Sequence, residues 1–162
     1  MSAQELDGLL GGHKTSRRIE VIRALYSLGI PFRSIKSEEL CHVDKVAPPR
    51  LILCDDVLFS DLSAIGGAGA GLDAGRAIER YIKAGGQVLY IAERPFEALY
   101  GQLDISPELK RLAGRANPRA TASIGRGRIT VLRLASPTHV QAREAVREFM
   151  SSYLSSRPIS LV

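Results

Sequence analysis

A helix, two glycines and a buried strand follow one another in residues 77–93, and this segment constrains the fold more than any other. Its first half has an apolar and a charged face at helical spacing: Ala77, Ile78, Tyr81 and Ile82 against Glu79, Arg80 and Lys83. Gly85 and Gly86 can take the left-handed conformation that ends a helix. Residues 88–92 are apolar without polar alternation, which predicts a strand covered on both faces.

The remaining sequence repeats this alternation of helices and strands. Helices are predicted at 16–28 and 137–154, and strands at 30–35, 51–54, 119–122 and 128–134. The apolar stripes of the two helices are predicted to be Ile19, Ile22, Leu25 and Tyr26, and Val146, Phe149, Met150 and Tyr153. Alternating strands and helices predict an α/β domain with a mostly parallel sheet, of the three-layer Rossmann-like or flavodoxin-like type. The last two strands, around the turn at 125–127, predict a C-terminal β-hairpin.

No repeat or linker divides the chain, so residues 1–162 are predicted to form a single domain, with 1–15 as a flexible or atypical start. The composition is 45% hydrophobic and 24% charged, and no apolar run approaches the roughly 20 residues that cross a bilayer. The first residues lack the basic and apolar regions of a signal peptide. We therefore expect a cytoplasmic protein without membrane contact.

The net charge is +5, and seven basic residues fall between positions 110 and 133 with no acidic residue among them. Six of them are candidates for contacts with nucleic-acid phosphates: Lys110, Arg111, Arg115, Arg119, Arg126 and Arg128. The alternative is a solvated strand edge that carries charge against unwanted pairing. The segment has no aromatic residue on which single-stranded bases could stack.

Polar residues follow two of the predicted buried strands. Asp55 and Asp56 come after the strand at 51–54, and Glu93 and Arg94 come after residues 88–92. Ligands of open α/β sheets bind at the carboxyl ends of strands, so these four residues are the candidates for ligand binding. The two aspartates could hold Mg²⁺ or accept a phosphoryl group, or they could simply end the strand.

No catalytic residue, metal site or cofactor is predicted. The glycine loop at 66–71 lacks the Gly-Lys-Ser/Thr ending of a P-loop and is interpreted as a flexible cover. Cys41 and Cys54 match no metal spacing, and there is no nucleophile elbow. His139 has a structural explanation, because Ser136 or Thr138 can cap the helix that begins beside it.

Four stretches carry a resemblance to a known family: "Leu-Gly-Ile-Pro-Phe" (28–32), "Pro-Arg-Leu-Ile-Leu-Cys-Asp-Asp" (49–56), "Arg-Tyr-Ile-Lys-Ala-Gly-Gly-Gln-Val-Leu-Tyr-Ile-Ala" (80–92) and "Gly-Arg-Gly-Arg-Ile-Thr-Val-Leu" (125–132). Over roughly residues 16–154 the chain resembles the class I glutamine amidotransferase-like superfamily. It is most similar to the non-catalytic branches, such as the β-galactosidase trimerisation domain and the related domain of gliding and intraflagellar-transport proteins.

The chain departs from the enzymes of that superfamily at three places. Ala92 stands where the resemblance puts the nucleophilic cysteine, and Gln141 stands where a glutamate would follow His139. The family opens with a strand, but residues 1–15 hold no convincing one. Either residues 6–10 provide it, or the sheet is short by a strand and exposes an edge that a partner could occupy.

The resemblance implies a non-catalytic α/β interaction or ligand-sensing module within a larger assembly, with a protein partner or a second copy of itself. Two alternatives stay open. One is a nucleic-acid-associated protein that uses the basic segment 110–133. The other is a hydrolase or a nucleotide- or sugar-binding enzyme that uses Asp55, Asp56 and Glu93.

Overall fold

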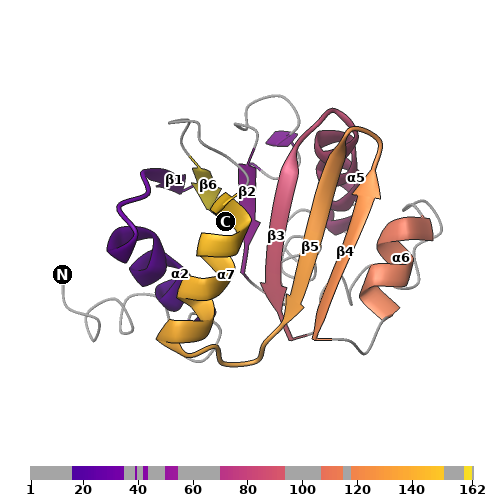
Figure 1. Ribbon diagram of the computed structural model, residues 1–162. Helices are drawn as coiled ribbons and strands as arrows, with labels where there is room; N and C mark the ends of the chain where they lie inside the picture. The colour runs from indigo at the N-terminus through magenta and orange to yellow at the C-terminus, as the bar shows by residue number, and fades with distance from the viewer. Residues whose placement is uncertain are drawn as a thin grey trace.

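The computed structural model describes residues 16–34, 39, 42–43, 50–54, 70–93, 107–114, 118–151 and 159–161. In chain order its helices and strands are α2 (Ser16–Ser27), β1 (Phe32–Ser34), β2 (Arg50–Leu53), α5 (Ala70–Lys83), β3 (Gln87–Ala92), α6 (Pro107–Gly114), β4 (Arg119–Ile124), β5 (Gly127–Arg133), α7 (His139–Ser151) and β6 (Ile159–Leu161). The described strands join one sheet in the order β1-β6-β2-β3-β5-β4 (Figure 1).

The sheet is mixed and mostly parallel. β1, β6, β2, β3 and β5 run in the same direction, and β4 runs antiparallel to β5. The β4–β5 pair keeps one register throughout, from Arg119 opposite Leu132 to Ile124 opposite Gly127. The predicted α/β class with a mostly parallel sheet is confirmed.

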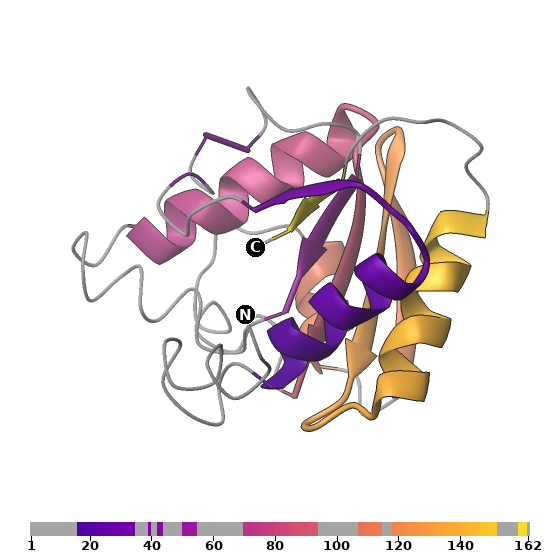
Figure 2. The same ribbon diagram turned by 90° about the vertical axis from the view of Figure 1, so that its left-hand side faces the viewer.

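Helices pack against both faces of the sheet. α2 and α7 lie on one face, called the front face here, and α5 and α6 pack on the back face (Figures 1 and 2). Successive strand residues point to opposite faces, so Leu89 and Ile91 of β3 join the front core, whereas Val88, Tyr90 and Ala92 join the back core. β3 is thus covered on both faces, as its unbroken apolar run predicts.

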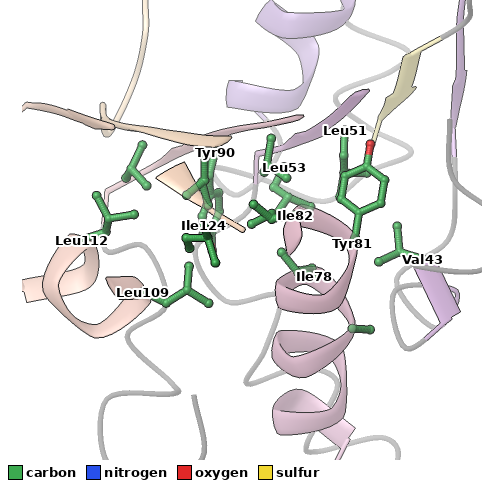
Figure 3. Close-up of a cluster of buried hydrophobic side chains, with 14 of the residues drawn as sticks. Val43, Leu51, Leu53, Ile78, Tyr81, Ile82, Tyr90, Leu109, Leu112 and Ile124 are labelled. Carbon is green, nitrogen blue, oxygen red and sulfur yellow. The ribbon is translucent and has the colours of Figure 1, made fainter. Parts of the chain in front are cut away.

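The back core joins two helices to the sheet. Ile78 and Ile82 of α5 and Leu109 of α6 pack into one buried cluster with Tyr90 and Leu53 of the strands (Figure 3). A fully buried side chain of this size contributes about 1.5 to 3 kcal/mol relative to an exposed one. This cluster therefore holds α5 and α6 on the sheet.

α5 ends in a glycine motif that needs its two glycines for different reasons. The Gly86 N–H donates to the Tyr81 carbonyl and the Gly85 N–H to the Ile82 carbonyl, each at 2.9 Å. Only Gly85 has a positive φ, 114°, so the expectation of a left-handed Gly86 is wrong. A Cβ on Gly86 would lie 2.4 Å from the Tyr81 ring, so the residue is small because the ring packs against it.

The turn between β4 and β5 packs against the same end of α5. The Arg126 N–H donates to the carbonyl of Lys83 at 3.2 Å, which satisfies one of the last carbonyls of the helix. A Cβ on Gly127 would lie 2.1 Å from the Ile82 oxygen and 2.2 Å from the Gly86 oxygen. Backbone meets backbone here, and only glycine fits.

Two helical residues differ in burial from the prediction: one that was predicted to be buried is exposed, and one that was predicted to be exposed is buried. Tyr26 was expected on the apolar stripe of α2 but is 75% exposed, with an edge-to-face contact to Phe32 at 5.7 Å. Val21 and Ala24 are buried in its place, because α2 turns these small residues toward α7. Glu79 was expected to face away but is 7% exposed and reaches Lys83 at 3.1 Å.

The buried face of α7 is also narrower than predicted. Val146 is buried as expected, together with Ala142 and Ala145. Phe149 and Met150 are half-buried at the margin of the front core, and Tyr153 lies outside the described residues.

The place beside β1 is filled by a strand that the sequence analysis missed. β6 pairs in parallel with β1 on one side and with β2 on the other. Residues 6–10, the alternative source of an opening strand, lie outside the described part of the chain. The two outer strands of the described sheet are β1 and β4.

Candidate functional site

The carboxyl ends of the parallel strands are the first place to look for a ligand site. Glu93 directly follows β3 and is exposed. Asp55, Asp56 and Arg94 lie outside the described residues. Ala92 belongs to β3 and is fully buried in the back core, so a side chain at this position would not reach solvent.

His139 sits at the start of α7 beside this edge. The Thr138 hydroxyl accepts a hydrogen bond from the Gln141 N–H at 3.2 Å, and the Gln141 side chain accepts one from the Thr138 N–H at 2.9 Å. This reciprocal pair is a capping box. It confirms Thr138 as the helix cap and explains Gln141 structurally. His139 Nδ1 lies 3.6 Å from Oε2 of Glu20 on α2, so it helps to join the two front helices.

The basic segment 110–133 is divided between different parts of the molecule. Arg119 and Arg128 lie on strands β4 and β5, on residues that alternate to the front face. Arg111 is on α6 at the back, and Arg126 is exposed in the turn between the strands. Arg115 and the side chain of Lys110 lie outside the described residues. The described arginines therefore do not form one continuous basic face.

Several other arginines are structural. Arg50 is 1% exposed at the start of β2, and its guanidinium donates to the carbonyl of Phe149 in the last turn of α7. Its charged group also lies over the Phe149 ring, 5.3 Å from the centroid. Arg133 donates to the carbonyl of Leu112, near the end of α6, at 3.3 Å. Each supplies a positive charge where the helix dipole is negative.

The front face of the β4–β5 pair is largely polar, and among the described helices α7 reaches only its margin. Figure 1 shows α7 in front of the β2 side of the sheet, with β5 and β4 uncovered beside it. Three residues of β4 that alternate to this face, Arg119, Thr121 and Ser123, are exposed. The hydroxyls of Thr121 and Thr130 lie 3.2 Å apart across the two strands. The front face thus changes from apolar over β2 and β3 to polar over β5 and β4.

A crevice of about 210 Å³ lies where α7 meets this polar face, and we call it the α7 crevice. Apolar residues of the sheet and of α7 line part of it: Val88, Leu89, Leu132, Ala145 and Phe149. Polar and charged residues line the rest: Gln87, Arg119, Arg128, Thr130, Glu148 and Ser151. The lining is therefore mixed, and the crevice can contact both an apolar and a polar part of a small molecule.

Arg119 and Glu148 form an ion pair from β4 to α7 in the lining of the crevice. The hydrogen bond from Arg119 holds the pKa of the Glu148 carboxyl below its usual value. The same bond raises the pKa of Arg119. Both side chains are about half exposed, so the pair contributes little to stability and mainly sets the charge of the crevice.

β4 offers a second feature, which is its outer edge. Arg133 donates its N–H to the carbonyl of Pro118 at 2.8 Å. Hydrogen-bonded and non-bonded pairs alternate along an antiparallel ladder, so Arg119, Thr121 and Ser123 turn their backbone N–H and C=O groups away from β5. A groove of about 220 Å³ runs between this edge and α6, lined by Glu108, Arg111, Leu112, Thr121, Ala122 and Ser123. We call it the α6 groove.

The sequence analysis missed the α7 crevice and the α6 groove, although one of its alternatives for the basic segment was a strand edge. It gave Arg119 and Arg128 as phosphate contacts, but not Glu148, which lies at the far end of a different element. The alternation of β4 and β5 could have shown that Arg119 and Arg128 share a face. The position of α7 over that face has no local signal in the sequence.

Comparison with protein-family models, with curated proteins and with solved structures yields no match to this chain. Within the described residues no three His, Cys, Asp or Glu side chains come together as metal ligands. None of the described helices is long and apolar enough to cross a bilayer.

Proposed function

We propose that the protein is a non-catalytic interaction module that binds an extended segment of a partner protein along β4. The observation that carries the proposal is the outer edge of this strand, which no described strand pairs. Sheet edges recruit extended peptides because their unpaired backbone groups are a template for another strand.

β4 has little of the protection that edge strands usually carry. Its register with β5 has no bulge, and it contains no proline or lysine. Its side chains are small except at its two ends, Arg119 and Ile124. An incoming strand would therefore meet the outward backbone groups of three residues, with α6 as the other wall of the groove: Arg119, Thr121 and Ser123.

The charges around the α6 groove indicate which partner segments can bind there. Arg111 is exposed at the groove, and Arg126 is exposed in the turn beyond β4. Glu108 is the acidic residue in the groove lining and is half-buried. Because positive charge is in excess along the segment that contains β4, we propose an acidic or neutral partner strand.

The order of the strands supports a Rossmann-like or flavodoxin-like domain with a β-hairpin at one edge, which is part of the proposal. If β6 is counted as the first strand, the order from β1 to β3 reads 2-1-3-4, as in the doubly wound flavodoxin-like sheet. In this arrangement β6 fills the place of the opening strand of the amidotransferase-like superfamily. Membership of a non-catalytic branch of that superfamily remains a proposal on this basis.

The two alternatives have less support. Nucleic-acid binding is favoured by the exposed Arg126 and Arg128, but Arg111 lies across the edge on α6 and Arg119 is paired with Glu148. An enzyme built on Asp55, Asp56 and Glu93 has only Glu93 within the described residues.

The test uses peptides selected from a displayed random library against the whole protein. We expect the selected sequences to be extended and rich in acidic residues, and to slow amide hydrogen exchange at Arg119, Thr121 and Ser123. Thr121→Pro removes one outward N–H without removing a bond to β5, and should abolish binding. Thr121→Val keeps the backbone donor and is the matched control.

Three outcomes would overturn the proposal: no peptide is selected, the protected amides lie away from β4, or Thr121→Pro binds as well as Thr121→Val. If Thr121→Pro does not fold, Ser123→Lys takes its place, because lysine on an edge strand discourages pairing. Light scattering of the unliganded protein identifies a second copy as the occupant, if dimers form and are lost in the same variants.

A further inference from the structure

We propose that the α7 crevice is a binding site for a small amphipathic anion, an organic acid with one negative charge and an apolar body. The site is separate from the open edge of β4, because it lies under α7 on the front face. The inference therefore does not depend on strand addition, and each can fail without the other.

The apolar part of the crevice comes from three elements. Leu89 of β3 and Leu132 of β5 rise from the sheet, and Ala145 and Phe149 descend from α7. Leu132 and Phe149 are only partly buried, so apolar surface at this place is open to a ligand. A ligand that covers this surface removes it from water, which favours binding.

The acid group has a receptor at the amino end of β5. Gln87 and Arg128 are direct neighbours in the register of β3 and β5, and both line the crevice. Strands in a sheet lie about 4.8 Å apart, so an amide and a guanidinium can bind one carboxylate together. Arg128 is exposed, and its side chain has no ion-pair partner among the described residues.

Glu148 determines how much negative charge the crevice accepts. Arg119 is already held by Glu148, so Arg128 is the cation that remains for a ligand. A carboxylate carries one negative charge, with which Arg128 can form an ion pair. A phosphate monoester carries nearly two negative charges, and the carboxylate of Glu148 in the same crevice would repel it. The site therefore prefers a monoanion.

The experiment is an NMR titration of the whole protein with hexanoate, hexanamide, hexyl phosphate and inorganic phosphate. We expect saturable shifts with hexanoate at the amides of Gln87, Arg128, Thr130 and Ser151. Hexanamide, which lacks the charge, and inorganic phosphate, which lacks the apolar body, should each bind at least tenfold more weakly than hexanoate. Arg128→Gln should weaken hexanoate at least tenfold, because a hydrogen-bonded charge is lost.

The matched control is Arg126→Gln, which removes the same charge two residues away, outside the crevice lining. It should leave the affinity for hexanoate unchanged. Glu148→Gln removes the repulsion and frees Arg119, so it should raise the affinity for hexyl phosphate above that for hexanoate.

If Arg128→Gln and Arg126→Gln lose the same affinity for hexanoate, the effect is one of general charge and the proposed site is wrong. Shifts that map away from α7, β3 and β5 would also show that it is wrong. If hexanoate and hexanamide bind equally well, the site does not recognise the acid group, and the proposal of an anion site is wrong. Thr121→Pro should not change hexanoate binding, which separates this result from the test of strand addition.

Discussion

Arginine has two different roles in this molecule, and burial separates them. Arg50 and Arg133 donate to carbonyls near the ends of α7 and α6 and so belong to the framework. Arg126 and Arg128 are exposed and available to a ligand. A net charge of +5 therefore overstates the basic surface that a partner meets.

Gly127 has no room for even a single added carbon. Gly127→Ala should lower the free energy of unfolding by about 3 kcal/mol, because its Cβ would overlap two backbone oxygens that cannot move separately. Gly85→Ala is the control: it has open space around it and a positive φ, so it should cost only about 1 to 2 kcal/mol. Urea unfolding of both variants measures the difference. Equal losses would mean that the turn can move away from α5.

The Arg119–Glu148 pair has a pH dependence of known sign. The hydrogen bond from Arg119 lowers the pKa of Glu148 in the folded protein. The ion pair therefore contributes fully to stability above the pKa that Glu148 has in the unfolded chain. This contribution is lost as the pH falls through the lower pKa of the folded protein. Titration of the Glu148 carboxyl carbon by NMR should give a midpoint below the ordinary range of glutamate. The midpoint should rise in Arg119→Gln. An unchanged midpoint in that variant would show that the pair does not form in solution.

At the scale of elements, β6 is the strand on which the sheet depends. Ser160 pairs with Arg33 on one side and Leu51 on the other. Ser160→Pro removes a ladder donor from the interior of the sheet and should destabilise the protein by about 1 to 3 kcal/mol or more. Hydrogen exchange at residues 32–34 should accelerate, because β1 pairs with no other described strand.

Thr121→Pro is the control for this variant, since it places proline in the outer strand β4 with the lost donor facing outward. Its melting temperature should stay close to that of the parent protein. If both prolines are equally harmful, β4 is not an open edge. If both are harmless, β6 is not an interior strand.

At the scale of the whole molecule, the sequence predicted those helices and strands that depend on interactions between nearby residues. The segment from α5 to β3 was predictable because helical spacing, a glycine at positive φ and an apolar run each act within a few residues. The exposed Tyr26 was not, because the buried side of α2 depends on how α7 packs against it. The α7 crevice depends on the same packing.

β6 illustrates the limit of such reasoning. Residues 159–161 are too few to show a periodicity. They become a strand because the gap between β1 and β2 offers backbone donors and acceptors on both sides. No property of the three residues alone reveals that gap.

The position of β6 also decides the order in which the molecule can assemble. Among the described strands, residues 32–34 pair with residues 159–161 alone, so this contact closes a very long loop and is formed slowly. On the ribosome, α2 and β1 are made before the other described elements, yet α2 packs on α7 and β1 pairs with β6, which both follow much later. Until then the edge of β2 that β6 occupies pairs with no described strand, and a chaperone or another nascent chain could bind there. Among the described strands, β6 is therefore the one that ends this exposure.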